Sequence, residues 1–126
     1  MRIGLLEDDV ATQEMVLLVL QDEGHTATIY ADAEECLKAL SIGNRQPSPT
    51  PIDLLIVDWR LSGTTSGIEV IQQIRQDNRL QDLPVILTTA APFSDTELLK
   101  TLHVALLEKP FAVDDMTTLV QRIVQA

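Results

Sequence analysis

Short apolar runs alternate along the chain with longer segments in which hydrophobic residues recur at helical spacing. The run at residues 54–57 is continuous and stops at one acidic side chain, Asp58. An unbroken apolar run of this length is typical of a strand that is covered on both faces, as in a parallel sheet. Four further runs rich in β-branched or aliphatic residues are also predicted to be strands. The five predicted strands are residues 2–6, 25–30, 54–58, 84–88 and 104–107.

A helix is predicted after each strand. Helix-start signals precede four of these segments: Asp9, Asp32 with Glu35, Ser66 with Glu69, and Ser94 with Glu97. The first helix is expected at residues 11–23 and ends before Gly24, and the last is expected at about residues 114–124. The apolar stripes are expected to consist of Met15, Leu18 and Val19 in the first helix, Ile68, Ile71 and Ile74 in the third, and Leu119, Val120, Ile123 and Val124 in the last.

The order of strand and helix, repeated five times, predicts an α/β fold with a doubly wound parallel sheet and right-handed crossovers. A length of 126 residues suits one domain, which we place at residues 1–126. The segment at residues 44–51 contains three prolines and no apolar periodicity, so it is predicted to be a surface loop.

Charge and composition narrow the function. The chain carries 19 acidic and 9 basic residues, a net charge of −10, and only 3% of its residues are aromatic. Phosphate backbones are held mainly by Lys and Arg, and single-stranded bases stack on aromatic rings. Direct binding to nucleic acid or to an anionic membrane is therefore not expected. The single cysteine, Cys36, forms no internal disulfide, and we see no signal peptide or long apolar span, so a cytoplasmic location is expected.

Chemistry enters where the strands end. The carboxyl ends of parallel strands share one edge of a sheet, which is where open α/β sheets bind ligands. Glu7 and Asp8 follow the first predicted strand, Asp58 ends the third, Thr89 follows the fourth and Lys109 follows the fifth. Two carboxylates about 5 Å apart repel by roughly 3 kcal/mol at an effective dielectric constant near 20. A divalent cation would offset this repulsion, and oxygen ligands of this kind favour Mg²⁺.

With Mg²⁺ bound, Asp58 could attack a phosphoryl group and become an aspartyl phosphate, while Lys109 and the hydroxyl of Thr89 hold the phosphoryl oxygens. Each residue alone has an ordinary alternative. Asp58 could be a turn residue, and the acidic residues after the first strand could interact with a helix dipole. Their coincidence at one sheet edge favours the phosphoacceptor interpretation.

These residues resemble the receiver domain of two-component response regulators, over essentially the whole chain. The resemblance is carried by the pair Glu7-Asp8 after an apolar strand, Asp58 at the end of the third strand, Thr89-Ala90 after the fourth, and Lys109-Pro110-Phe111 after the fifth. It implies a flavodoxin-like sheet in the order 2-1-3-4-5 with five helices. It also implies a signalling role in which the domain catalyses only its own phosphorylation and dephosphorylation.

The resemblance further implies the role of each residue. Asp58 would accept phosphate from a sensor histidine kinase or a histidine phosphotransfer protein, and a downstream output protein or domain would respond. Asp8 and Asp58 would bind Mg²⁺ together with the backbone carbonyl of Arg60, with Glu7 acting mostly through ordered water. Thr89 and Lys109 would bind the phosphoryl group, and the Lys109-Pro110 bond would be cis.

Three features depart from the family pattern. Leu106 stands three positions before the lysine, where an aromatic residue that is coupled to the threonine is usual. The loop from Ser62 to Gly67 lacks a common proline and is one residue longer than usual, and His103-Val104 replace a Gly-Ala pair. These changes leave the phosphorylation chemistry intact and affect how a signal would reach the surface.

Two alternatives stay open on the sequence. A receiver-like scaffold that binds partners independently of phosphorylation is suggested by Leu106 and the altered loop. A Mg²⁺-dependent phosphohydrolase resembling the haloacid dehalogenase group would need a second acid two residues after the nucleophile, where this chain has Arg60.

Overall fold

Five parallel strands form one sheet in the order β2-β1-β3-β4-β5 in the computed structural model, which describes residues 1–42, 50–61, 65–90 and 96–125. The strands are β1 (Arg2–Leu6), β2 (Thr26–Tyr30), β3 (Leu54–Asp58), β4 (Val85–Thr89) and β5 (Val104–Glu108). This is the flavodoxin-like order, so the predicted fold class and topology are confirmed. Every residue of β3 and β4 is buried, as the continuous apolar runs predict.

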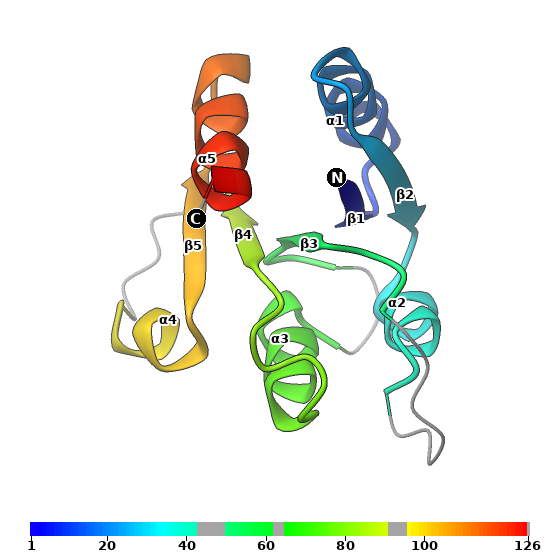
Figure 1. Ribbon diagram of the computed structural model, residues 1–126, viewed down its shortest axis with the longest axis vertical. Helices are drawn as coiled ribbons and strands as arrows, with labels where there is room; N and C mark the ends of the chain where they lie inside the picture. Colours follow the sequence, from blue (N-terminus) through cyan, green and yellow to red (C-terminus); the bar gives the residue numbers. More distant parts are fainter. Residues whose placement is uncertain (43–49, 62–64, 91–95, 126) are drawn as a thin grey trace.

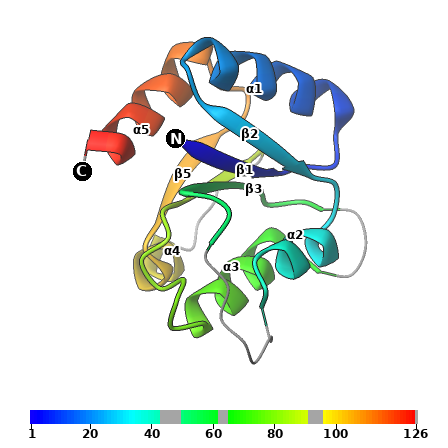
Figure 2. The ribbon, with the colours of Figure 1, turned by 45° about the vertical axis from the view of Figure 1, so that its right-hand side comes forward.

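Five helices cover the two faces of the sheet (Figures 1 and 2). They are α1 (Val10–Asp22), α2 (Ala33–Ala39), α3 (Gly67–Gln76), α4 (Thr96–Leu102) and α5 (Val113–Gln125). Helices α1 and α5 pack on one face, where Val16, Leu20, Met116 and Val120 join one hydrophobic cluster. Helices α2, α3 and α4 pack on the other face and contribute to a second cluster. The described helices thus cover both faces of the sheet, and its carboxyl edge is not covered by them.

The predicted caps are present where the structure describes them. The side chains of Asp9, Asp32 and Ser66 each accept a hydrogen bond from a backbone N–H in the first turn of the helix that follows, at distances of 3.0, 2.8 and 3.2 Å. Gly24 has φ +85° just after α1, which suits the predicted stop. The Ser94 cap, most of the loop at residues 44–51 and the turn that begins at Ser62 lie outside the described residues.

Two predicted apolar stripes need correction. In α1, Val16 and Leu20 are buried, whereas Leu18 is 67% exposed and Met15 is 38% exposed. Six consecutive apolar residues at positions 15–20 made the inward face ambiguous to helical periodicity. In α5, Val124 is 45% exposed and lies in the last turn of the helix. The stripe of Ile68, Ile71 and Ile74 in α3 is confirmed as buried.

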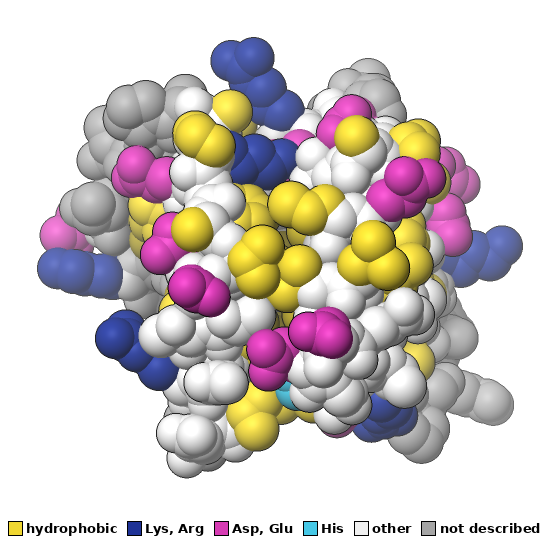
Figure 3. Space-filling view, turned by 90° about the horizontal axis from the view of Figure 1, so that it is seen from above, with side chains coloured by type: hydrophobic (Ala, Val, Ile, Leu, Met, Phe, Trp, Pro, Cys, Tyr) yellow, Lys and Arg dark blue, Asp and Glu magenta, His cyan; other side chains and the backbone are white. Residues whose placement is uncertain are grey.

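The face of α1 and α5 therefore carries exposed apolar side chains. Figure 3 looks onto this face and shows hydrophobic side chains gathered along and between the two helices, with acidic side chains beside them. The exposed large hydrophobic residues of the two helices are Val10, Met15, Leu18, Val113 and Val124. Among the described residues, none of the helices combines the length and the apolar character that crossing a membrane requires.

The amino edge of the sheet is held by arginines. Arg75 at the end of α3 donates to the carbonyl oxygens of Leu102 (2.7 Å), Leu80 (2.9 Å) and His103 (3.3 Å). Arg79 donates to the carbonyls of Leu40 and Ser41 at the end of α2. The last carbonyls of a helix have no intrahelical partner, so these two side chains satisfy the ends of α4 and α2.

Candidate functional site

The carboxyl edge of the sheet brings together side chains that are far apart in the sequence. β1 ends directly before Glu7, Asp58 is the last residue of β3, Thr89 is the last residue of β4, and Lys109 follows β5. Backbone hydrogen bonds continue the sheet past the strand ends, from the Trp59 N–H to the Thr88 carbonyl (2.7 Å) and from the Lys109 N–H to the Thr89 carbonyl (2.6 Å). The edge is therefore a rigid base for the side chains that it carries.

Three carboxylates meet at this edge. One oxygen each of Glu7, Asp8 and Asp58 lies within 4.8 Å of the other two. At this separation each pair of ionised carboxylates repels by about 3 kcal/mol at an effective dielectric constant near 20. Glu7 is 1% exposed and Asp58 is 8% exposed, so solvent screens their repulsion poorly. This cluster needs positive charge nearby.

Lys109 supplies part of that charge. Its Nζ lies 2.7 Å from Oε1 of Glu7 and 3.4 Å from Oδ1 of Asp58. Burial opposes the charged form of the ammonium, but its contacts with Glu7 and Asp58 outweigh burial and raise the pKa of Lys109. The ammonium thus contacts two of the three carboxyl groups and offsets part of their repulsion.

Glu7 lies at the base of the cluster and is tightly held. Its Oε2 accepts hydrogen bonds from the backbone N–H of Asp8 (3.1 Å) and of Asp9 (3.5 Å). Burial raises the pKa of Glu7 to about 7; the contact with Lys109 opposes this rise, and the nearby Asp58 adds to it. Both oxygens of the Glu7 carboxylate therefore have protein partners. Ionisation of Glu7 still costs free energy, because the carboxylate is buried.

A pocket of about 320 Å³ opens above the cluster. It is lined by Asp8, Asp58, Arg60, Leu61, Ala90 and Lys109. Asp58 is thus buried on its strand side and accessible from the pocket. A phosphoryl group entering here would reach Asp58 and Lys109 together.

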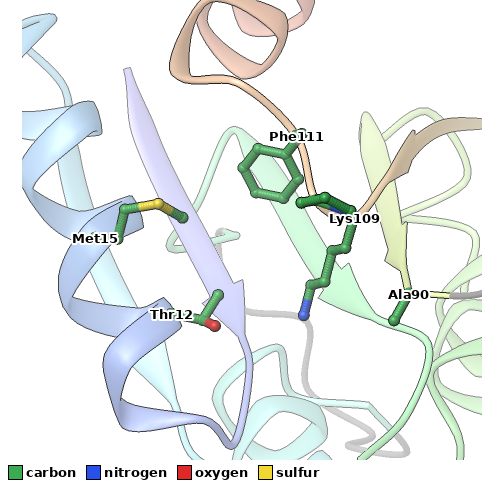
Figure 4. Close-up of a pocket in the computed structure, with 6 residues that line it drawn as sticks. Thr12, Met15, Ala90, Lys109 and Phe111 are labelled. Atoms are coloured by element: carbon green, nitrogen blue, oxygen red, sulfur yellow. The ribbon is translucent and has the colours of Figure 1, made fainter.

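A second pocket of about 390 Å³ adjoins the first, because Ala90 and Lys109 line both. Figure 4 shows Met15 on α1 facing Phe111 across the pocket and Thr12 facing the amine of Lys109, which extends toward the carboxyl ends of β1 and β3. The apolar wall of this second pocket shields the stem of Lys109 and leaves its ammonium directed at the carboxylates.

The structure places the residues predicted from the sequence at two depths. Asp8, Asp58, Arg60 and Lys109 line the first pocket, and Thr89 is 1% exposed directly before Ala90, which also lines it. Glu7 lies beneath the other carboxylates. The Lys109-Pro110 peptide bond is cis, as predicted from the resemblance.

Two neighbours of the site were missed by sequence reasoning. The Nε2 of Gln13 on α1 donates to the backbone carbonyl of Glu7 at 2.5 Å. Gly67 begins α3 and packs against the backbone of Asp58. No local pattern marks the Gln13 contact. A glycine at the first position of a capped helix is a signal of close packing that could have indicated the contact of Gly67.

The donor set fits a hard divalent cation. The three residues that could share a metal ion offer carboxylate oxygens alone, without a thiolate or an imidazole. Such a set suits Mg²⁺ or Ca²⁺ better than a transition metal. The pocket also leaves room for water or for a phosphoryl oxygen to complete the coordination. The carboxyl edge therefore offers the oxygen ligands that a hard divalent cation requires.

A parallel 2-1-3-4-5 sheet with an acidic cluster and a lysine at its carboxyl edge defines a class of signalling domain, and comparison with known proteins agrees. A family model for the response regulator receiver domain matches residues 3–121, so the chain belongs to this family. This family serves two-component signalling systems.

The similar proteins differ in size and in the process that their names give. PhoB of Escherichia coli, a phosphate regulon transcriptional regulatory protein, is 27% identical over 126 residues, which cover 98% of this chain and 52% of PhoB. The chemotaxis protein CheY of Pseudomonas aeruginosa is 34% identical over 91 residues, 71% of this chain and 67% of CheY. The chain spans about half the length of PhoB.

Solved structures share the fold. The response regulator TrrA of Thermotoga maritima, in complex with Mg²⁺ and BeF, superposes with a TM-score of 0.79 at 29% identity and 97% coverage of both chains. The chemotaxis response regulator CheY4 of Vibrio cholerae gives a TM-score of 0.82 at 21% identity, again covering 97% of both chains. The second likeness is evidence for the fold alone.

Proposed function

We propose that this chain is a phosphoacceptor signalling domain in which Asp58 receives a phosphoryl group from a phosphohistidine, in a Mg²⁺-dependent reaction. The phosphohistidine belongs to a sensor kinase or a histidine phosphotransfer protein. The observation that carries the proposal is the contact of one lysine with two of three clustered carboxylates beneath an open pocket. The TrrA structure, which holds Mg²⁺ and BeF in this fold, supports the same assignment.

The transfer has a simple balance. A carboxylate oxygen of Asp58 attacks the phosphorus, the new O–P bond forms as the N–P bond of the phosphohistidine breaks, and the imidazole leaves with the electron pair. Bound Mg²⁺ would offset negative charge on the transferred phosphoryl oxygens. Asp8, Asp58 and the backbone carbonyl of Arg60 are the proposed ligands. Glu7 is proposed to act through ordered water, which agrees with the protein contacts of both its oxygens.

Lys109 and Thr89 bind the product in this proposal. The ammonium of Lys109 already lies 3.4 Å from Oδ1 of Asp58, so it can bind a phosphoryl oxygen with little rearrangement. Thr89 is buried at the end of β4, and its hydroxyl is the proposed second donor to the phosphoryl group. Binding of the phosphoryl group by Thr89 would couple the phosphorylation of Asp58 to the position of the end of β4. This would shift the equilibrium between conformations of the surface near β4.

The output is proposed to be a partner protein or an attached domain. PhoB is named as a transcriptional regulator and CheY as a chemotaxis protein, so the relatives support control through more than one kind of output. The net charge of −10 argues against direct contact with nucleic acid or an anionic membrane by this domain. A buried free thiol at Cys36 suits the reducing cytoplasm, which we propose as its location.

The test is phosphoryl incorporation with a small acyl phosphate or phosphoramidate as donor. With Mg²⁺, intact mass spectrometry should show one added phosphoryl group on the wild type and none on Asp58→Asn. This variant removes one of the three repelling carboxylates, so it should be at least as stable as the wild type and serves as a folded control. Labelling of Asp58→Asn, or an unmodified wild type, would sink the proposal. Sustained turnover of phosphate esters would favour a hydrolase.

A second candidate is a scaffold whose partner binding is independent of phosphorylation, and Leu106 favours it. Leu106 is half-buried in β5 and packs against the same hydrophobic cluster as Leu98 of α4. An aliphatic side chain here has no hydroxyl and no ring to follow a movement of Thr89. Equal partner affinities of the phosphorylated and unphosphorylated forms would support the scaffold.

A further inference from the structure

We propose that Gly67 is a positioning residue for Asp58: because Gly67 has no side chain, the first turn of α3 seats directly on the backbone of the phosphoacceptor. This inference rests on the function proposed for Asp58. The required feature is space and not backbone conformation, since Gly67 does not adopt the left-handed φ that distinguishes Gly24.

The contact leaves no room for a Cβ atom. A Cβ placed on Gly67 would meet the carbonyl oxygen of Asp58 well inside 3.0 Å, a distance below which real Cβ atoms essentially never lie. It would also lie 3.0 Å from Cγ1 of Val57 and 3.1 Å from the carbonyl carbon of Asp58. The nearest obstacle is thus the main chain of a central strand, which cannot rotate away as a side chain can.

The strand side of the contact is fixed. Asp58 pairs with Thr88 in the register of β3 and β4, and the next residue, Trp59, donates its N–H to the carbonyl of Thr88 at 2.7 Å. Movement of the Asp58 carbonyl would strain these bonds in the middle of the sheet. It would also move the carboxylate of the same residue relative to Lys109.

The helix side is fixed as well. The Gly67 N–H donates to the Trp59 carbonyl at 3.2 Å, and Ser66 caps the helix by accepting from the Glu69 N–H at 3.2 Å. Ile71 and Ile74, farther along α3, are fully buried under the sheet. A side chain at position 67 therefore has to displace either the start of α3 or the peptide of Asp58, and both displacements reach the site.

Small displacements matter at such a site. Asp58 and the carbonyl of Arg60 are two of the proposed metal ligands, and both leave the strand next to the Gly67 contact. Functional constellations tolerate roughly 0.5 Å of error, and a misplacement of about 1 Å can cost on the order of 100-fold in rate. We expect Gly67→Ala to lower both the Mg²⁺ affinity and the rate of phosphoryl incorporation, by roughly 10- to 100-fold.

The chain offers two matched controls with the same chemical change. The three atoms nearest to a Cβ on Gly4 belong to side chains in the core and not to the backbone, at 2.9 Å in Ile52 and in Tyr30 and 3.2 Å in Leu55. A Cβ on Gly24 would meet no atom within 4 Å, but its φ of +85° disfavours alanine. Gly4→Ala and Gly24→Ala therefore test core strain and backbone strain without touching Asp58.

The experiment titrates Mg²⁺ into the wild type and the three alanine variants, well below each melting temperature. The fluorescence of Trp59 reports binding, because this residue is adjacent to Asp58 and is the only tryptophan in the chain. Phosphoryl incorporation from a small donor is measured in parallel. All three variants should lose stability, but only Gly67→Ala should lose Mg²⁺ affinity and rate.

A folded Gly67→Ala variant with wild-type Mg²⁺ affinity and rate would overturn the inference. If this variant is unfolded in buffer, the titration is repeated in trimethylamine N-oxide, which strengthens folding without touching the site. Failure to fold even there would also count against the inference, because Gly67 would then serve the fold as a whole. A wild type that binds no Mg²⁺ and accepts no phosphoryl group would instead refute the proposed function.

Discussion

The two edges of the sheet differ in how their charged side chains are arranged. At the amino edge, cationic side chains meet backbone carbonyls and single carboxylates: Arg75 holds the end of α4, Arg79 holds the end of α2, and Arg2 pairs with Asp53 at 3.1 Å. At the carboxyl edge, three carboxylates meet one lysine. At the amino edge each arginine thus has acceptors of opposite charge or polarity, whereas the carboxyl edge brings three groups of the same charge together.

This difference follows from the direction of the chain. In a parallel α/β fold every helix returns from the carboxyl edge to the amino edge, so the unsatisfied carbonyls at helix ends gather at the amino edge. Arginine satisfies several of them at once, because its guanidinium has five N–H donors. The N–H groups at helix starts gather at the carboxyl edge and favour acidic side chains there. The caps Asp9, Asp32 and Ser66 satisfy this demand at α1, α2 and α3, and the cluster of Glu7, Asp8 and Asp58 comes in addition to them. Its charge is better explained by a ligand than by the fold.

The largest expected effect is a loss of stability at the carboxyl edge as pH rises. Because burial raises the pKa of Glu7 to about 7 from an ordinary value near 4.5, the folded state holds a proton that the unfolded chain has already lost. This contribution to stability is fully present below pH 4.5 and disappears as pH passes through 7. Urea unfolding without Mg²⁺ should show the free energy of unfolding falling by up to about 3 kcal/mol between these limits.

Glu7→Gln is the control for this pH effect. It removes the titrating group, so the free energy of unfolding should become nearly independent of pH between 5 and 7, roughly the range that the Glu7 shift spans. Asp9, Asp53 and Asp77 do not interfere, because their hydrogen-bonded partners lower their pKa values and move their titration to more acidic pH. If the free energy of unfolding of Glu7→Gln depended on pH as strongly as that of the wild type, the raised pKa of Glu7 would not be the cause of the pH effect.

A smaller effect is expected at the amino edge from Arg75→Ala. The substitution removes the donor to three carbonyls, and a hydrogen bond to a charged group contributes about 1.5–3 kcal/mol. We expect denaturant unfolding to show a loss of about 2 kcal/mol. Arg75→Lys should recover only part of this loss, because an ammonium lacks the planar fork of guanidinium. Full recovery by lysine would show that charge alone holds the end of α4.

The smallest effect is expected from Arg2→Ala, also at the amino edge. Its side chain is 57% exposed and that of Asp53 is 41% exposed, so solvent screens the ion pair. The midpoint of urea unfolding should barely move, and added salt should not change the difference from the wild type. A large loss would show that this pair also fastens β1 to β3.

The sequence predicted the order of elements and the carboxyl-edge residues because these depend on local pattern and on topology. Asp58, Thr89 and Lys109 each stand at the end of an apolar run, and parallel strands bring such ends together. The arginines of the amino edge were not predicted, since Arg75 reaches carbonyls 27 and 28 residues away. The contact of Gly67 with Asp58 likewise depends on how closely a helix approaches a strand.

The inward face of α1 shows where pattern fails. Residues 15–20 are all apolar, so periodicity favoured Met15 and Leu18, whereas the packed structure buries Val16 and Leu20. The choice is made by the sheet and by α5, which lie on one side of the helix. When a helical segment is apolar on every face, tertiary packing decides which of its side chains point into the core.

The most direct test of the contrast between the edges is the melting temperature as a function of Mg²⁺ concentration. If the carboxyl edge is completed by a cation, the melting temperature of the wild type should rise with Mg²⁺, by an amount equivalent to about 2.7 kcal/mol at 100 times the dissociation constant. Asp8→Asn should abolish the rise, and Arg75→Ala should melt lower but keep it. A wild type that is insensitive to Mg²⁺, or an equal rise in Asp8→Asn, would contradict the account.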